Sequence, residues 1–270
     1  MALDFEFLLK PEKILGVNIS AVIITKNEEK NIAEAIASVL WADEILVVDS
    51  ESADRTVEMA EAAGARVISR EWPGFSAQKQ FAADSASNDW IFSLDADERV
   101  SQELKEEILN LKDQPENDLA DGFRIARLSY YMGHAIRHGG WYPDRQLRLF
   151  NRKKGRWKDV LIHESVEMNA GTRTATLENN ILHYSVENAA HHHRMIGERY
   201  APLAAEQMFG RGRRTSPFKV AAAGPAAFFQ AYILKGGFLD GFPGFCIARF
   251  AAHHAFLKHL LLWEKQKEVR

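Results

Sequence analysis

Short apolar runs rich in β-branched residues alternate with longer amphipathic stretches over the first third of the chain. The apolar runs cover residues 19–24, 44–48, 66–68 and 90–94, and amphipathic stretches such as 31–40 and 56–63 lie between them. Strands buried on both faces have this appearance, and each intervening stretch is long enough for a right-handed crossover between parallel strands. The pattern therefore predicts βαβ units, and with them an α/β fold with a mostly parallel, Rossmann-like sheet and flanking helices.

The regular alternation of apolar runs and amphipathic stretches ends after residue 114. The change predicts three regions that differ in secondary structure. Strands are expected at 122–128, 146–151 and 177–184, and from residue 187 to the end the chain is expected to be a helical appendage. Residues 1–17 form an N-terminal extension without a matching pattern. We expect one α/β domain at 18–186, with a first half at 18–114 and a second at 115–186, followed by a helical region at 187–270.

Composition excludes several classes of protein. The 270 residues include 34 Lys and Arg against 37 Asp and Glu, a net charge of −3, and duplex-binding proteins usually show a basic excess instead. A lone cysteine, Cys246, leaves no disulfide framework and fits a reducing compartment. The N-terminus lacks a signal-peptide pattern, and the longest uncharged stretch, 220–234, is shorter than the roughly 18 residues of a spanning helix. These features predict a cytoplasmic protein without nucleic acid as a partner.

Polar residues follow the first, second and fourth apolar runs. Ligands of open α/β sheets bind beyond the carboxyl ends of the strands, so these residues are candidates for binding. Asp95 and Asp97 would share a face if the strand continued through both, and such paired carboxylates suit Mg²⁺ or Mn²⁺ with substrate phosphates completing the shell. The alternative is an Asp-rich loop that only caps the helix expected near Ser101. The candidate binding residues of the three strand ends are Thr25, Asn27, Glu28, Asp49, Asp54, Asp95 and Asp97.

These motifs resemble the donor-binding half of the family 2 glycosyltransferases. Enzymes of that family have a GT-A fold and invert the configuration at the anomeric carbon of the transferred sugar. The likeness rests on Thr-Lys-Asn-Glu-Glu at 25–29, Val-Val-Asp-Ser-Glu-Ser-Ala-Asp-Arg-Thr at 47–56 and Leu-Asp-Ala-Asp-Glu at 94–98. Later segments, at 139–150, 162–164, 182–184 and 237–241, resemble the lipopolysaccharide-core β-1,4-glucosyltransferase branch. The resemblance covers about residues 20–263. It makes 18–114 the half that binds the nucleotide sugar and 115–186 the acceptor half.

The resemblance also implies roles for single residues of the donor half. Thr25, Asp49 and Asp54 would contact the nucleoside, while Asp95 and Asp97 would hold the ribose and a metal-bound diphosphate. Lys79, on a helix expected after Gly74, would reach a phosphate. The alternative for Lys79 is an ordinary solvent-exposed helix face.

An inverting transfer needs a base that takes the proton of the acceptor hydroxyl, while a metal neutralises charge on the leaving diphosphate. Glu164 is the preferred base because His163-Glu164 follows a short apolar run and is expected at a strand end; Asp144 is the other candidate. Arg145 and Arg148 would bind the diphosphate or an acceptor phosphate, or else pair structurally with nearby acids. The expected acceptor-binding residues are Trp141, Tyr142, Arg145, Arg148 and His163.

The histidines give weaker indications. His183 is the best candidate for a further metal or phosphate contact, because GT-A enzymes often place a histidine downstream of the Asp-x-Asp, although a structural core histidine fits equally well. His191, His192 and His193 point in three directions on one helix and cannot bind one ion together. We interpret them as a polar helix surface.

The C-terminal region is the most aromatic part of the chain and contains a basic cluster at 211–219. Three interpretations are open: a helical layer on the catalytic domain, a surface that binds anionic inner-membrane lipid peripherally, and a homo-oligomer interface.

The sequence therefore predicts an inverting, metal-dependent hexosyltransferase that moves a sugar, glucose from UDP-glucose, to a lipid-linked saccharide of the lipopolysaccharide inner core. Another envelope glycan or a protein is an alternative acceptor. A nucleotidyltransferase is a second class, although the segment after the first strand lacks the glycine-rich loop expected of one. A non-catalytic nucleotide-sugar-binding or scaffold protein is a third.

Overall fold

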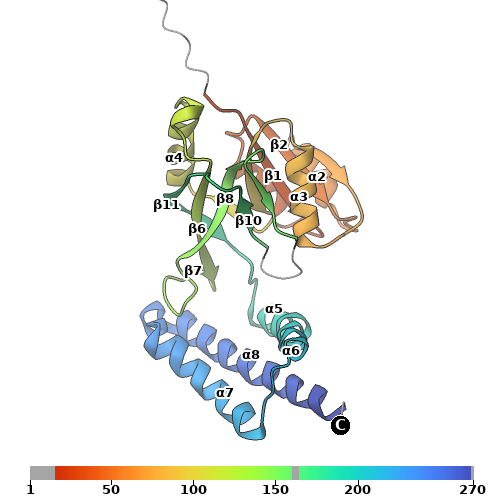
Figure 1. The fold of residues 1–270 in the computed structure, drawn as a ribbon, viewed down its shortest axis with the longest axis vertical. Helices are drawn as coiled ribbons and strands as arrows, with labels where there is room; N and C mark the ends of the chain where they lie inside the picture. Colours follow the sequence, from red (N-terminus) through yellow and green to blue (C-terminus); the bar gives the residue numbers. More distant parts are fainter. Residues whose placement is uncertain (1–15, 160–163, 269–270) are drawn as a thin grey trace, which may run out of the picture. The chain divides into compact units, whose positions relative to one another are not determined.

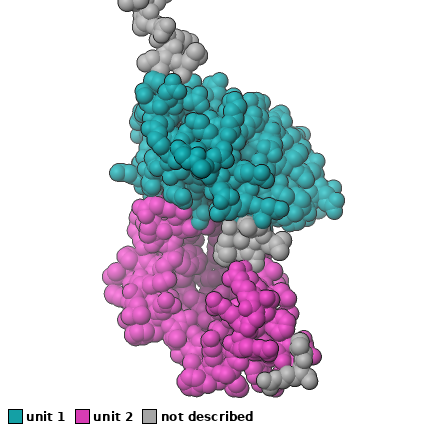
Figure 2. Space-filling view, in the orientation of Figure 1, with its two compact units in different colours: residues 1–125, 146–181 teal, residues 126–145, 182–270 magenta. Residues whose placement is uncertain are grey.

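The computed structural model describes residues 16–159 and 164–268, so most of the N-terminal extension lies outside the described residues. It divides into two compact units, coloured separately in Figure 2. Unit 1 consists of the chain up to Ile125 together with Gln146–Ile181. Unit 2 consists of Ala126–Arg145 together with the chain from Leu182 onward.

Unit 1 begins with the predicted alternation of strands and helices (Figure 1). Its elements are β1 (Ile19–Thr25), α1 (Ile32–Ser38), β2 (Glu44–Asp49), α2 (Thr56–Ala62), β3 (Arg66–Ser69), α3 (Phe75–Ser85), β4 (Trp90–Asp95), β5 (Glu98–Val100), α4 (Gln102–Lys112), η1 (Glu116–Asp118), β9 (Gly155–Trp157) and β10 (Val166–Met168). Three longer strands contribute residues to both units: β6 (Gly122–Tyr131), β8 (Asp144–Asn151) and β11 (Thr174–His183). The strands predicted at 122–128, 146–151 and 177–184 are thereby confirmed.

The strand order of the sheet is β3-β2-β1-β4-β8-β6-β11-β5. β3, β2, β1 and β4 are mutually parallel, as βαβ crossovers require, and β8 runs antiparallel to β4. A separate antiparallel pair joins β9 to β10. This arrangement confirms the predicted α/β, Rossmann-like GT-A fold.

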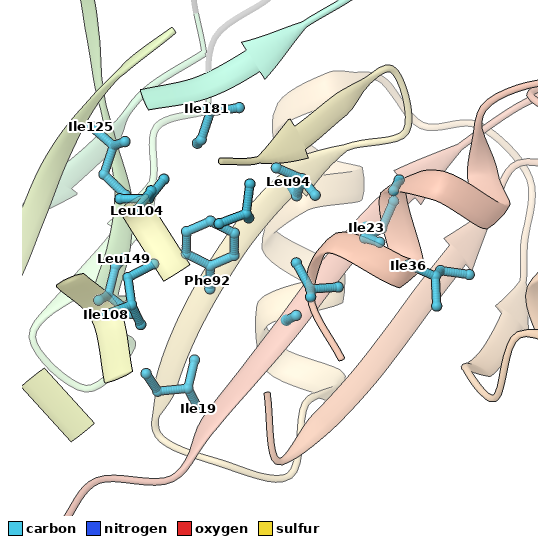
Figure 3. Packing of buried hydrophobic residues seen from close by; sticks show 14 of the residues in the cluster. Ile19, Ile23, Ile36, Phe92, Leu94, Leu104, Ile108, Ile125, Leu149 and Ile181 are labelled. Carbon is cyan, nitrogen blue, oxygen red and sulfur yellow. The ribbon is translucent and has the colours of Figure 1, made fainter. Parts of the chain in front are cut away.

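Alternating residues of the central strands build two apolar layers, one on each face of the sheet. On one face Ile19 and Ile23 of β1 and Phe92 of β4 pack with residues of α1, α2 and α4, among them Ile36 and Leu104 (Figure 3). On the other face the intervening residues of the same strands pack against α3 and β9. Burial on both faces explains why the strands appear in the sequence as unbroken apolar runs.

Two residues mark ends of the flanking helices, and one of them is Ser101, near which the sequence predicted a helix start. Gly64, just after α2, has a φ of 88°, in the left-handed region that glycine tolerates best. The Ser101 hydroxyl accepts a hydrogen bond from the Leu104 amide and so caps α4. These two residues therefore fix where the flanking helices end and begin.

Unit 2 contains the short strand β7 (His134–Ala135) and the helical C-terminal region (Figure 1). Its helices are α5 (Ala189–Arg194), the π-helix η2 (Met195–Tyr200), α6 (Ala201–Gly210), α7 (Pro217–Phe229), the π-helix η3 (Gln230–Leu234), the 3₁₀ helix η4 (Gly237–Asp240) and α8 (Gly241–Glu268). α7 and α8 pack side by side as a hairpin. A Cβ at Gly224 of α7 would come within 3.3 Å of the Ala252 carbonyl oxygen of α8, so glycine permits the close approach. Among the described helices, none combines the length and apolar character that crossing a bilayer requires.

Candidate active site

The carboxyl ends of β1, β2 and β4 lie side by side, as the sequence predicted. Thr25 is the register partner of Asp49, and Ile24 is the partner of Asp95. Because the three strands are parallel, their last residues and the loops that follow meet at one edge of the sheet. Thr25, Asp49 and Asp95 are thus brought together in unit 1.

The loops after β1 and β2 are tied to each other by hydrogen bonds. The Asn27 amide donates to the Ser52 hydroxyl at 2.8 Å, and the Asn27 side-chain oxygen accepts from the Ala53 amide at 2.8 Å. The Glu28 amide donates to the Thr56 hydroxyl at 2.8 Å. Asn27 and Glu28 therefore set the shape of this part of the edge, and their direct contact with a nucleotide stays a prediction.

The Asp54 carboxylate joins the two loops, because it accepts from the amide of Glu29 and from that of Thr56, the first residue of α2. Burial alone would raise its pKa, but hydrogen bonds from the Thr56 hydroxyl and amide and from the Glu29 amide lower it. The carboxylate is therefore held charged in a structural contact. The nucleoside contact expected for Asp54 stays a prediction.

Buried polar atoms without a hydrogen-bond partner gather at the same edge. Among the described residues, the hydroxyl oxygen of Thr25 and the side-chain oxygen of Gln78, on α3, have none. The Gln78 amide nitrogen donates to the Ser50 hydroxyl at 3.1 Å, which places Gln78 beside the end of β2. Leaving buried polar groups unsatisfied costs free energy, so such atoms mark places where a polar ligand is expected.

Lys79 is the centre of a cluster of charges. Its ammonium lies 2.9 Å from Oδ1 of Asp95, 3.5 Å from Oε1 of Glu164 and 5.1 Å from the centroid of the Trp157 ring. The residue is only 3% exposed, so the alternative of an ordinary solvent-exposed helix face is wrong. A buried cation at the strand ends suits a phosphate, although the phosphate contact itself stays a prediction.

Arg148 extends this cluster inward. Its guanidinium donates to Glu98 at 2.7 Å and to Asp95 at 3.2 Å, and the Glu98 side chain is fully buried. Arg145 and Arg148 are three residues apart on β8 and so face opposite sides of the sheet, and the phosphate contact expected for them stays a prediction. Arg145 is exposed, whereas Arg148 has the structural pairing with acids that the sequence left open.

The Asp95-Ala96-Asp97 segment does not continue as a strand. β4 ends at Asp95 and residues 96–97 form a turn before β5, so the expectation that the two carboxylates share a strand face is wrong. Both side chains are half-buried at the strand end. They provide the hard oxygen ligands that Mg²⁺ or Mn²⁺ prefers. Among the described residues no group of three His, Cys, Asp or Glu is placed to hold a metal ion.

Glu164 lies in the connection between β9 and β10, two residues before β10 begins, and not at the carboxyl end of a described strand. Its contact with Lys79 nevertheless places it beside Asp95. The side chain is 26% exposed and so remains reachable by a substrate. His163, expected to bind the acceptor, lies outside the described residues.

A second candidate site lies within unit 2, at a pocket of about 370 Å³. It brings together Trp141, Asp144 and His183 from the predicted set, and adds Arg127 and Ser129, which sequence reasoning missed. Asp144 Oδ2 accepts from both Nε and Nη2 of Arg127. His183 Nδ1 lies 3.2 Å from the Ser129 hydroxyl. The Tyr142 ring, next to Trp141, faces the Arg137 guanidinium at 5.7 Å.

His192 also lines this pocket and is buried, so the interpretation of the histidine run as a polar helix surface is wrong for it. Its ring packs 4.1 Å from that of Phe250 and 5.5 Å from that of Tyr131. Burial, and to a lesser degree the neighbouring His191, lowers the pKa of His192 to about 4. The neutral imidazole is thus part of the apolar packing of the pocket.

We expect this histidine to make stability depend on pH. An unfolded chain protonates His192 near pH 6.5 and the folded chain only near pH 4, so the free energy of unfolding falls as pH drops through 6.5 and levels off below about 4. Burial lowers the pKa values of His254 and His259 as well. His192→Phe should therefore weaken, without abolishing, the decrease in Tm between pH 7 and pH 5. His134→Phe, at an exposed position, should keep the full decrease, and equal slopes for both variants would contradict the assignment.

The model of "Glycosyl transferase family 2" matches residues 20–180, well over half of the chain. The chain belongs to glycosyl transferase family 2. Relatives support this assignment over nearly the whole length. An uncharacterized glycosyltransferase of Rickettsia bellii is 33% identical over 91% of this chain and 86% of its own. The lipopolysaccharide core biosynthesis glycosyltransferase LpsC of Rhizobium meliloti is 32% identical over 92% of both chains.

Solved structures of glycosyltransferases are more distant. S. aureus TarS, solved with UDP-GlcNAc, has a TM-score of 0.48 and 14% identity over 94% of this chain and 92% of that one. A glucosyl-3-phosphoglycerate synthase of Mycobacterium tuberculosis, solved with Mn²⁺, UDP-glucose and phosphoglyceric acid, is 34% identical over 31% of this chain and 34% of its own, with a TM-score of 0.29. As a member of family 2, this chain is a glycosyltransferase.

Several residues of the two sites were not found from the family 2 motifs. Glu98 directly follows Asp97 and Gln78 precedes Lys79, so sequence proximity offered a signal for these two. No sequence signal marked Arg127, because its partner Asp144 lies 17 residues away and belongs to a different strand. His192 could not be distinguished from its two histidine neighbours until the packing of its helix was known.

Proposed function

We propose that this glycosyltransferase transfers glucose from UDP-glucose, with inversion, to a lipid-linked saccharide of the lipopolysaccharide inner core. The observation that carries the proposal is the group formed by Lys79, Asp95 and Glu164 at the ends of the parallel strands. In this group Lys79 is a cation that can bind a phosphate, and Asp95 is a carboxylate that can bind the ribose or a metal ion. Glu164 is a carboxylate that can act as a base. The similarity to LpsC supports the choice of acceptor.

The donor fits the edge of β1, β2 and β4. Asp49 is buried and accepts from the Ser52 amide at 2.9 Å, which leaves its position fixed for a nucleoside contact. The Thr25 hydroxyl oxygen and the Gln78 side-chain oxygen supply unused polar atoms beside it. Lys79 and Asp95 follow at the next strand, where the ribose and diphosphate would lie.

Asp97 and Asp95 would hold a divalent cation, with Asp97 as its principal protein ligand. Asp95 already faces Lys79 at 2.9 Å and Arg148 at 3.2 Å, so its charge is balanced by the chain itself. When bound, the cation neutralises charge that develops on the leaving diphosphate. Lys79 acts in the same sense from the protein side, because it is a fixed positive charge in a buried position.

Glu164 is the proposed base. It belongs to the same charge cluster as Asp95, whereas Asp144 is held by two nitrogens of Arg127. A carboxylate that accepts two hydrogen bonds from a guanidinium is stabilised in its charged form. It is therefore suited to binding rather than to accepting a proton. We assign Asp144, together with Trp141, to the recognition of acceptor sugar in the pocket of unit 2, where Trp141 offers an aromatic face and Asp144 and Ser129 offer hydrogen bonds.

The test is donor binding and slow donor hydrolysis by the full-length chain. UDP-glucose with Mn²⁺ should raise Tm and be hydrolysed more than UDP-galactose, UDP-GlcNAc or GDP-mannose, and EDTA should remove both effects.

Asp97→Ala should abolish the Mn²⁺-dependent increase in Tm and the Mn²⁺-dependent hydrolysis. Asp113→Ala changes an exposed aspartate beyond α4 and should behave as wild type. Equal binding with EDTA or in Asp97→Ala would refute the metal site, and a preference for another donor would refute UDP-glucose. Transfer to lipopolysaccharide truncated in the inner core then tests the acceptor.

A further inference from the structure

The α7–α8 hairpin exposes several phenylalanine side chains. On α7, Phe218, Pro225 and Phe229 recur at spacings of seven and four residues, which places them on one side of the helix. Phe218 is 82% exposed and Phe229 is 54% exposed. Surface aromatics in such a row are not needed for packing, so they indicate a surface that binds something.

The partner helix carries a matching row. Phe242, Phe245, Arg249 and Phe256 follow one another on α8 at spacings of three, four and seven residues, and the three phenylalanines are 65%, 38% and 40% exposed. The two rows border a common groove of about 470 Å³, lined by Gly224, Pro225, Phe228, Arg249, His253 and Phe256. Pro225, Arg249 and Phe256 of the two rows line this groove, and we call the two rows together with the groove the hairpin face.

The charge of this region selects the kind of partner. From residue 211 to residue 263 the sequence has one acidic residue, Asp240, although the whole chain has a net charge of −3. The Asp240 side chain is only 7% exposed and lies 2.8 Å from Nδ1 of His138. The basic residues of this stretch are Arg211, Arg213, Arg214, Lys219, Lys235, Arg249 and Lys258. Of these, Lys219 lies on α7, and Arg249 and Lys258 lie on α8. Exposed aromatics within a stretch that has seven basic residues and one acidic residue fit the interface of an anionic lipid bilayer.

The hairpin is also bonded to the wall of the acceptor pocket. The Gly139 amide donates to the Lys235 carbonyl at 2.9 Å, and Asp240 accepts from the His138 amide at 2.8 Å. Gly140 and Trp141, which follow directly, line the pocket. A chain bound to lipid through the hairpin would thus hold this pocket wall close to the bilayer.

We propose that the hairpin face binds the surface of an anionic lipid bilayer, with its phenylalanines at the level of the headgroups and Arg249 and His253 facing lipid phosphate in the groove. This surface is separate from the residues assigned to the donor and the metal. It explains how a chain without a described spanning helix would reach a lipid-linked acceptor.

The experiment is co-sedimentation of the full-length chain with vesicles of phosphatidylcholine alone, or with about one third phosphatidylglycerol added. Wild type should bind only the anionic vesicles, and less in high salt. Phe229→Ser/Phe242→Ser and Arg249→Glu should each weaken binding at least about fivefold. The controls Leu40→Ser and Arg124→Glu alter exposed residues of unit 1 and should bind as wild type. All variants change exposed side chains, so Tm and donor hydrolysis should stay unchanged, which separates this proposal from that of the donor site.

Three outcomes would overturn the proposal. Equal binding to both kinds of vesicle would exclude recognition of anionic lipid. Failure of wild type to bind either kind would exclude a membrane surface altogether. A wild-type dimer in light scattering that dissociates in Phe229→Ser/Phe242→Ser, without vesicle binding, would make the hairpin face a contact between two copies of the chain.

Discussion

Glu164→Gln should lower the kcat of sugar transfer by about 10²- to 10⁴-fold, the range that a positioned general base contributes. The amide keeps the size of the carboxylate but cannot accept the proton of the acceptor hydroxyl. The loss should appear in kcat and not in donor affinity, because the side chain contacts Lys79 only at 3.5 Å and the closer Lys79–Asp95 pair stays intact. The measurement is steady-state transfer together with UDP-glucose binding by calorimetry.

Glu167→Gln is the matched control, because Glu167 belongs to the adjoining strand β10 and its side chain is 66% exposed. It should retain wild-type kcat. A fall in kcat with unchanged UDP-glucose binding is a split that a purely structural role for Glu164 would not cause. If Glu164→Gln keeps full activity while Asp144→Asn loses it, the base is Asp144 and the arginine contact of that residue has a catalytic purpose.

The parallel part of the sheet in unit 1 could be predicted closely from the sequence because its signals are local. Strands buried on both faces leave apolar runs, and the positions of Thr25, Asp49 and Asp95 at the ends of those runs follow directly from a parallel sheet. The expectation that Asp97 shares a strand face with Asp95 was wrong, because a turn after Asp95 breaks the two-residue period on which it relied. A tight turn is decided by a few residues and leaves little trace in periodicity.

The contacts of the charged side chains could not be predicted, because they join distant parts of the chain. Lys79 and Glu164 are 85 residues apart, and nothing in either neighbourhood marks the other. A lysine on an amphipathic helix usually faces water, and only the closure of β9 over α3 buries this one beneath Trp157. The exposed phenylalanines of the hairpin show the same limit, since hydrophobicity alone predicts burial for them.

Arg148→Met should destabilise unit 1 by about 3–5 kcal/mol, the cost expected when one partner of a buried ion pair is removed. Glu98 is fully buried and its 2.7 Å bond to the guanidinium would be lost, while methionine fills most of the volume. A single domain typically has only about 5–15 kcal/mol of stability in total, so the loss should be plain in urea-induced unfolding. Arg145→Met, three residues earlier on β8 and exposed, should stay within about 0.5 kcal/mol of wild type.

A second substitution separates the charge from the packing. In Arg148→Met/Glu98→Gln the buried negative charge is gone, and the glutamine oxygen can still accept from the Asp95 amide as Glu98 does at 2.9 Å. The double variant should therefore recover much of the lost stability, because an uncharged amide is far less costly to bury than a carboxylate without its guanidinium. If the double variant is no more stable than Arg148→Met, the loss comes from packing around the arginine, and the charge of Glu98 is balanced by other groups. Recovery of stability without recovery of donor binding would show that Arg148 also positions Asp95, its second partner at 3.2 Å, for the donor.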